Sequence, residues 1–347
     1  MNVASLFRRY SQQVIYAGMA LIFSASGVCV DAASSRLETR LPDEEYFAIE
    51  LHRIPTGHHW LKASLNGKVG YFILDTGAGG TVLDPSALNR FGIEADSAQG
   101  VKTSAGAGGA AQFKLYPVES FSIEEHALEL SEVAAVDLGA VLPGLSSLAG
   151  VNLHGIIGQD VLTAHAGILE VSADHLYLRK TSGKEPEATD ASAAWRQSLL
   201  GDGFMTLPLE KLSTGHETVG AEINGVEGRF IIDSGARLSV VNGARLAHFD
   251  MKPSDRLEQE SASGGVGGAI SIRIYRLREF RLEEVTIPQV TIGAFDLSAV
   301  VSAIEGETGV AVDGVIGQDT LLRHRAIIDI AGQFLLLADV PQEGESR

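Results

Sequence analysis

The sequence predicts a mostly β protein whose single chain folds into two similar lobes related by a pseudo-twofold axis. Three observations support this fold class. Residues 56–91 and 214–249 align without a gap at an offset of 158 positions. Each copy has alternating apolar residues on both sides of an Asn-Gly pair, a pattern typical of a β-hairpin. A polar, weakly periodic segment, residues 180–203, predicts a linker between an N-terminal lobe, residues 33–179, and a C-terminal lobe, residues 204–347.

The same elements follow the hairpin in both copies. The second hairpin strand is apolar on both faces and leads into a glycine-containing loop, a short strand and a short helix. Asp84, followed by Pro85, and Asn242 are the expected N-caps of these helices. After a strand-rich stretch, each copy has an apolar-apolar-Gly sequence and a second short helix, for which Asp160 and Asp319 are the expected N-caps.

The first residues, 1–32, are expected to be a signal peptide. Arg8 and Arg9 precede an uncharged stretch, residues 14–30, and Ala32 supplies a small residue for cleavage. An uncleaved membrane anchor formed by residues 14–30 is the alternative, because this stretch is near the lower length limit for a span. We therefore expect an exported protein, periplasmic or secreted, that meets a membrane only through this segment.

Composition and charge narrow the classes of partner. The only cysteine, Cys29, lies in the predicted signal peptide, so thiol chemistry and disulfides are excluded from the lobes. The net charge of −17 argues against nucleic acid as a partner. No spacing of His and acidic residues is typical of a metal site. We expect a two-lobed monomer with no metal and no cofactor.

The two glycine-containing loops are the candidate site. "YFILDTGAGG" (71–80) and "RFIIDSGARL" (229–238) each run an apolar strand into aspartate, a hydroxyl residue and glycine. The glycine permits a tight turn that brings amides toward the carboxylate, and the hydroxyls can hydrogen-bond across to the other copy. If the lobes pack about a twofold axis, Asp75 and Asp233 meet and share one proton. One then serves as a general base on water while the other protonates a carbonyl oxygen.

These loops resemble the active-site loops of retropepsin-like aspartic proteases, and two further motifs strengthen the resemblance. Glycine-rich segments, "GAGGA" and "GVGGA", occupy the place of the flap hairpin, and "IIGQDVL" and "VIGQDTL" match the strand that supports the active-site loop. The resemblance implies active-site loops at Asp75, Thr76, Gly77, Ala78, Asp233, Ser234, Gly235 and Ala236. It implies flap residues Gly106, Gly108, Gly109, Gly265, Gly267 and Gly268.

The resemblance also implies a fold and an activity. The fold is the two-lobed acid-protease fold, in which each lobe is a retropepsin-like closed β-barrel or sandwich with a short helix. The two lobes are joined in one chain, as in pepsin-like enzymes. The implied activity is that of an exported aspartic endopeptidase acting on protein or peptide substrates through Asp75 and Asp233.

The sequence departs from the family pattern at three places. Ala78 and Ala236 cannot donate a side-chain hydrogen bond to the carboxylates, so we expect activity at mildly acidic pH rather than at strongly acidic pH. Gln159 and Gln318 stand where the family often has arginine. Arg237 replaces the glycine of the first lobe; it could act on the carboxylates or bind an acidic substrate side chain, but a solvated loop arginine is favoured.

Alternative readings remain at this point. His58, His216, His165 and His324 recur between the lobes, and structural roles are favoured over a metal site for all four. A noncatalytic peptide-binding pseudoprotease with the same fold is the main functional alternative. A two-carboxylate glycosidase is the third, and low aromatic content argues against it.

Overall fold

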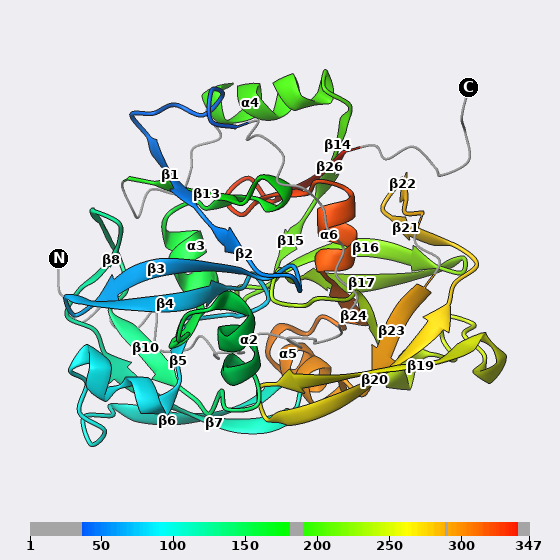
Figure 1. Cartoon of the computed structure of the whole chain (residues 1–347). Coiled ribbons are helices and arrows are strands. Elements are labelled where there is room, and N and C mark those ends of the chain that lie inside the picture. Colours follow the sequence, from blue (N-terminus) through cyan, green and yellow to red (C-terminus); the bar gives the residue numbers. More distant parts are fainter. Residues whose placement is uncertain (1–36, 181–189, 289–290, 339–347) are drawn as a thin grey trace.

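The computed structural model describes residues 37–180, 190–288 and 291–338 and shows two β-rich lobes within one molecule (Figure 1). The predicted signal peptide, residues 1–32, lies outside these described residues. Within the part of the chain that the structure describes, no helix is long and apolar enough to cross a membrane. The mostly β, two-lobed prediction is confirmed.

The N-terminal lobe is built on a ten-stranded sheet. Its order is β6-β7-β10-β5-β11-β4-β3-β8-β9, with β2 beside β3. The strands are β2 (His52–Arg53), β3 (His59–Leu65), β4 (Lys68–Leu74), β5 (Val82–Leu83), β6 (Gly100–Gly106), β7 (Gly109–Pro117), β8 (Phe121–Ile123), β9 (His126–Leu128), β10 (Glu132–Ala135) and β11 (Gly155–Ile157). The helices are η2 (Pro85–Ala87), η3 (Asn89–Phe91), α2 (Leu142–Ala149), α3 (Gln159–Ala164) and η4 (Val171–Ala173).

The C-terminal lobe repeats this sheet strand for strand. Its order is β19-β20-β23-β18-β24-β17-β16-β21-β22, with β15 beside β16. The strands are β15 (Glu210–Lys211), β16 (Glu217–Ile223), β17 (Val226–Ile232), β18 (Val240–Asn242), β19 (Arg256–Gly265), β20 (Gly268–Arg276), β21 (Phe280–Leu282), β22 (Val285–Thr286), β23 (Thr291–Phe295) and β24 (Gly314–Ile316). The helices are η5 (Gly243–Arg245), η6 (Pro253–Asp255), α5 (Ser298–Thr308) and α6 (Gln318–Arg323). In both lobes the pairings of the described residues form a linear path, without a pairing that closes it into a barrel.

The predicted hairpins form with the expected turns. Asn66 and Gly67 join β3 to β4 with φ values of 50° and 71°, and Asn224 and Gly225 join β16 to β17 with φ values of 55° and 85°. A two-residue turn with positive φ at both positions matches the right-handed twist of the strands it joins, and asparagine and glycine tolerate this conformation. The turn chemistry therefore fixes the register of the strands that lead to both aspartates.

A third sheet of six strands joins the lobes, in the order β1-β13-β12-β25-β26-β14. Its centre is the antiparallel pairing of β12 with β25, one strand from each lobe. In Figure 1 this sheet and helix α4 (Asp190–Leu200) lie on the side of the molecule opposite β6, β7 and β20. The strands are β1 (Tyr46–Glu50), β12 (Ile168–Glu170), β13 (His175–Arg179), β14 (Phe204–Pro208), β25 (Ile327–Asp329) and β26 (Phe334–Ala338).

Helix α4 lies within residues 180–203, the segment expected to be a plain linker. Trp195 and Leu199, one helical turn apart, are buried against side chains of the six-stranded sheet. Arg196 places its Nη1 2.5 Å from Oδ2 of the buried Asp329. The weak periodicity of the sequence did not reveal the burial of these side chains. Because they are buried, part of the predicted linker is a packed helix.

Candidate active site

Both aspartates stand at the ends of buried strands. Asp75 follows β4 and Asp233 follows β17, and neither residue has exposed surface. The neighbouring parallel strand supports each loop, because the amide of Asp75 donates to the carbonyl of Ile157 and that of Asp233 to Ile316, at 3.0 Å each. This is the supporting role predicted for the apolar-apolar-Gly strands β11 and β24.

The hydroxyl residues tie the two loops together, as the sequence predicted. The Thr76 hydroxyl accepts from the Ser234 amide at 2.9 Å and donates to the Ile232 carbonyl at 3.0 Å. The Ser234 hydroxyl accepts from the Thr76 amide at 3.0 Å and contacts the Leu74 carbonyl at 3.4 Å. Because every bond crosses from one lobe to the other, the relative position of the loops is fixed by backbone as well as by side chains.

The carboxyl groups of Asp75 and Asp233 lie next to each other, and each shifts the pKa of the other. Oδ2 of each is buried and bonds no donor among the described residues. The Gly77 amide donates to Oδ1 of Asp75 at 2.8 Å, and the Gly235 amide donates to Oδ1 of Asp233 at 2.7 Å. Each glycine also lies against the opposite aspartate: a Cβ on Gly77 would be 2.3 Å from Cγ of Asp233. The two loops therefore fit together only with glycine at this position.

Burial is the main cause of the shifted pKa values of the two aspartates. It raises the pKa of Asp75 to about 6, against opposing hydrogen bonds from Asp233 and from backbone amides. Burial also raises the pKa of Asp233 well above its usual value, and the negative charge of Asp75 adds to this effect. Both shifts favour the protonated form, so this pair takes up a proton at a higher pH than two isolated carboxyl groups would.

The two glutamines that follow the supporting strands hydrogen-bond the active-site loops. Nε2 of Gln159 donates to the Thr76 carbonyl at 2.9 Å, and Nε2 of Gln318 donates to the Ser234 carbonyl at 2.8 Å. The glutamines thus hold the loops without the charge of an arginine.

The predicted N-cap role of Asp160 and Asp319 is wrong, because Gly158 and Gly317 are the N-caps of α3 and α6. The carboxylate of Asp160 accepts instead from the amide and hydroxyl of Thr81, at 2.8 and 2.7 Å. Asp319 accepts in the same way from Ser239. Each aspartate therefore fastens the chain just beyond the active-site loop to the helix behind it.

Arg237 is not the solvated loop arginine that the sequence favoured. Only 7% of its surface is exposed, and burial lowers its pKa while the charge of Asp319 raises it. It also lies close enough to His58 to lower the pKa of that ring. Since the first lobe has a glycine, Gly79, at this place, the site carries a buried positive charge on one side only.

Two histidines that the sequence placed in plain turns reach the active-site loops. His58 and His216 are fully buried, and their Nε2 atoms lie 2.9 Å and 3.1 Å from the carbonyls of Gly235 and Gly77. The recurrence of Thr-Gly-His in both copies was the signal that could have revealed this role. His165 and His324 cap the C-termini of α3 and α6, in the structural positions expected of them.

The glycine-rich segments form two hairpins, β6–β7 and β19–β20, whose tips cross. The Gly108 amide donates to the Val266 carbonyl at 2.8 Å. Ala105 and Ala107 of the first tip pack into the apolar core of the C-terminal lobe, whereas Val266 of the second packs into that of the N-terminal lobe. Each tip is thus anchored in the lobe to which it does not belong. A hollow of about 350 Å³ lies beside Gly106–Gly109 and the start of α5.

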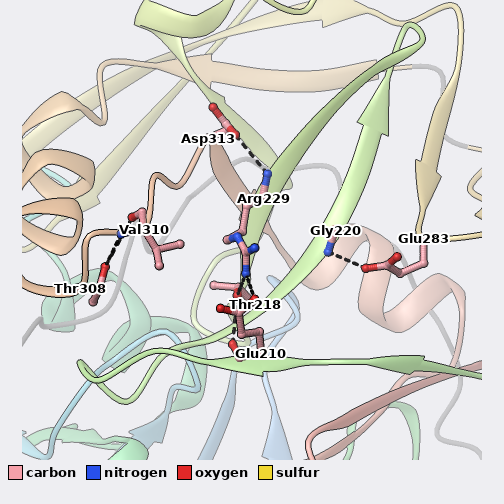
Figure 2. Close-up of polar contacts among 8 residues, drawn as sticks. All are labelled: Glu210, Thr218, Gly220, Arg229, Glu283, Thr308, Val310 and Asp313. Atoms are coloured by element: carbon pink, nitrogen blue, oxygen red, sulfur yellow. Dashed lines mark hydrogen bonds and ion pairs between the residues drawn. The ribbon is translucent and has the colours of Figure 1, made fainter.

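A separate hollow of about 620 Å³ in the C-terminal lobe is lined by neither aspartate. Figure 2 shows the polar contacts there: the Arg229 amide donates to Asp313 at 3.0 Å, its guanidinium contacts Glu210, and the Gly220 amide donates to Glu283 at 3.0 Å. Glu210, Glu283 and Asp313 are thus engaged with groups of their own lobe. Among the described residues, no three His, Cys, Asp or Glu side chains are grouped to hold a metal ion.

Comparison with solved structures returns proteins that match most of this chain and one that matches a smaller part of it. The chain is similar to an aspartic proteinase from Irpex lacteus (12% identity, 86% of this chain and 99% of that one, TM-score 0.41). It is similar to basic 7S globulin from soybean (10% identity, 87% and 97%, TM-score 0.42). A retropepsin-like aspartic protease from Rickettsia conorii matches 38% of this chain and 98% of its own (19% identity, TM-score 0.30).

Comparison of the sequence with curated proteins and with family models identifies the family more specifically than the solved structures do. No curated protein matches the chain. The family model described as aspartyl protease matches twice, at residues 61–161 and 219–320, which together span more than half of the chain. Each match contains one aspartate loop, one glycine-rich hairpin and one supporting strand. The chain therefore belongs to the aspartyl protease family and carries the family's domain twice.

Proposed function

We propose that this protein is an aspartic endopeptidase in which Asp75 and Asp233 share one proton and activate a water molecule. The observation that carries this proposal is the pairing of two fully buried carboxyl groups across the lobe boundary. Each is held by the glycine amide of its own loop and lies against the glycine of the opposite loop. Membership of the aspartyl protease family supports peptidase activity in general.

In the proposed reaction the ionised carboxyl takes a proton from water as the water oxygen attacks the carbonyl carbon of the peptide bond. The protonated carboxyl donates its proton to the carbonyl oxygen, which gives a neutral tetrahedral diol. The diol then breaks its C–N bond while a proton passes to the leaving nitrogen. The pair finishes with one proton, as it began, and needs no covalent intermediate.

The substrate class proposed is a protein or peptide segment in extended conformation. The crossed hairpins have glycines at their tips, which permit large changes in φ and ψ. Lifting of the tips would open the buried carboxyls to a peptide, whose backbone could then pair with the exposed strand edges. We propose in addition that residues 1–32 direct export to a periplasm or out of the cell. A monomer suffices, because one chain supplies both loops.

The experiment compares the parent protein with Asp233→Asn and with Asp96→Asn, an exposed aspartate of the N-terminal lobe. Each is incubated with a diverse peptide mixture from pH 4 to 7.5, with and without a statine-type inhibitor. We expect cleavage by the parent and by Asp96→Asn, block by the inhibitor, and a loss of roughly 1,000-fold or more in Asp233→Asn.

Two results would contradict the proposal. A folded parent that binds peptides but cuts none would identify a pseudoprotease. Equal cleavage by the parent and by Asp233→Asn would place the activity elsewhere.

A further inference from the structure

Two Thr-Gly-His turns, residues 56–58 and 214–216, cross the boundary between the lobes. His58 belongs to the N-terminal lobe, yet its Nε2 contacts the Gly235 carbonyl of the opposite active-site loop at 2.9 Å. His216 makes the reciprocal contact with Gly77 at 3.1 Å. The arrangement is therefore twofold, with each lobe holding the loop of the other.

The chemistry of the contacts fixes the tautomer of both rings. A carbonyl oxygen can only accept, so Nε2 carries the hydrogen and donates it. Nδ1 is then an acceptor, and it lies 2.7 Å from the Thr56 hydroxyl in His58 and 2.9 Å from the Thr214 hydroxyl in His216. Burial lowers the pKa of His58 to about 3 and that of His216 to about 4, so both rings are mainly neutral at the mildly acidic pH expected for the proposed reaction. The charged or titratable neighbours of His58 are His59 and Arg237.

A short path leads from each ring to a carboxyl group. Gly235, whose carbonyl receives the His58 hydrogen, donates its own amide to Oδ1 of Asp233 at 2.7 Å. That carbonyl also shares a peptide unit with the Ala236 amide, which donates to the backbone carbonyl of Asp233 at 3.3 Å and lowers the pKa of its side chain. The same path runs from His216 through Gly77 and Ala78 to Asp75. Donation to a carbonyl polarises its peptide unit and strengthens the amide on the other side.

The glycine of each turn allows the close approach. Gly57 has φ of +94°, and a Cβ there would lie 3.1 Å from Cβ of Gln318, the residue that holds the Ser234 carbonyl. Gly215, with φ of +89°, faces Gln159, and a Cβ there would lie 3.5 Å from Cβ of that glutamine, an ordinary contact, so at this position the positive φ is what favours glycine. Each turn therefore meets the opposite loop twice, through its histidine and through the glutamine behind that loop.

We propose that His58 and His216 are positioning residues that hold the opposite active-site loop, and through its amides the opposite aspartate, in the geometry the reaction needs. This inference rests on the function proposed above for Asp75 and Asp233. It explains why Thr-Gly-His occurs in both copies. A turn with a purely local role would need no contact with the other lobe, whereas both histidines make one.

Hydrogen exchange of the full chain, read by mass spectrometry, tests the proposal without relying on activity. His58→Leu removes the donor, His58→Gln keeps a donor near the place of Nε2, and His165→Leu is the matched control. His165 is a buried histidine whose two ring nitrogens bond backbone groups outside the site. We expect His58→Leu to speed exchange in residues 233–238, His58→Gln to restore protection, and His165→Leu to leave this loop unchanged.

His216→Leu should instead speed exchange in residues 75–80. If His58→Leu does not fold, Thr56→Val, which removes only the hydroxyl that orients the ring, takes its place. Faster exchange confined to the turn at residues 52–60, or the same change in residues 233–238 for His165→Leu, would overturn the proposal.

Kinetics provide the second readout. In a parent that cleaves peptides, His58→Leu should lower kcat by roughly 10- to 100-fold with little change in KM. It should also move the acidic limb of the pH profile to higher pH, because a weaker amide bond stabilises the carboxylate less. His58→Gln should recover most of kcat. An unaltered kcat and pH limb in His58→Leu would overturn the inference, whereas an inactive parent would defeat the proposed function and leave the exchange result to decide this one.

Discussion

The carboxyl group of Asp75 occupies the space that a side chain on Gly235 would need. A Cβ on Gly235 would lie 2.3 Å from Cγ of Asp75, although the two residues belong to different lobes. The reciprocal pair, Gly77 and Asp233, has the same spacing. The glycine after each hydroxyl residue thus serves the opposite aspartate, in addition to the turn in its own loop.

We therefore expect Gly235→Ala to separate the two loops. The added methyl group must displace a buried carboxyl, so unfolding should require about 2–4 kcal/mol less free energy, and peptide cleavage should be lost. Gly306→Ala, on an exposed and open position of helix α5, is the control and should stabilise the protein by about 1 kcal/mol. Urea unfolding measures both. Equal stability of Gly235→Ala and the parent would contradict the contact.

The pH profile of cleavage should follow the raised pKa values of the aspartates. The active form carries one proton on the pair. Acidification below the pKa of Asp75, about 6, adds a second proton and removes the base. Rates measured on one peptide should therefore rise from pH 4 through about pH 6, as the alanines after the active-site glycines suggested. A maximum at the strongly acidic pH typical of pepsin would contradict this expectation.

Removal of the Arg196 charge should destabilise the sheet that joins the lobes. Arg196 lies 2.5 Å from Asp329, which is 2% exposed and whose pKa is raised by burial, and its guanidinium stacks 4.8 Å over the ring of Phe334. Arg196→Met leaves a buried carboxylate without its cation and should cost about 3–5 kcal/mol at pH 7.5. The cost should shrink on acidification, because protonation of Asp329 removes the unpaired charge.

The control for this experiment is Arg40→Met. Arg40 pairs with Asp202 at 2.6 Å, but both side chains are about one-quarter to one-third exposed. Its loss should cost less than about 1 kcal/mol in the same denaturant titration. Equal losses for the two variants would mean that burial of Asp329 does not govern the effect.

Glu217 is expected to destabilise the fold as the pH rises from about 4.5 through neutral. Its side chain is fully buried, 3.6 Å from Nζ of Lys211, and burial raises its pKa to about 7, against the attraction of that lysine. The folded pKa lies above the usual value, so the stability that this group contributes is complete below about pH 4.5 and is lost as the pH rises through 7. Glu217→Gln should therefore gain up to about 3 kcal/mol over the parent between pH 5 and 8. Thermal unfolding at several pH values checks this, and a pH-independent difference would count against it.

Much of the site could be predicted because its chemistry repeats at a fixed offset. Local rules sufficed for the Asn-Gly turns, for the caps at Asp84 and Asn242, and for the cross-lobe role of Thr76 and Ser234. Each of these features depends on residues close in sequence, or on a twofold relation that the repeat itself indicates.

The remaining features depend on contacts that no local pattern specifies. Helix α5 begins at Ser298, its N-cap Leu297 offers no side-chain hydrogen bond, and the helix contains a glycine, so the sequence offered no helix signal there. Only 7% of the surface of Arg237 is exposed, and the loop sequence around it gives no signal of this burial. His58 and His216 stand in turns by local rules, and only the assembled lobes bring their rings to the opposite loops.

The crossed hairpin tips have a kinetic consequence. Gly106 lies under Val266, whose carbonyl would be 2.3 Å from a Cβ at that glycine, and Ala107 is inserted in the far lobe. Neither tip can lift without disturbing the other, so admission of a ligand is one concerted event. The observed rate of peptide capture should then level off at high peptide concentration, at a ceiling set by the protein's own opening rate. Stopped-flow measurements would reveal that ceiling. The need for both tips to open together would select against compactly folded partners, which cannot offer a free strand.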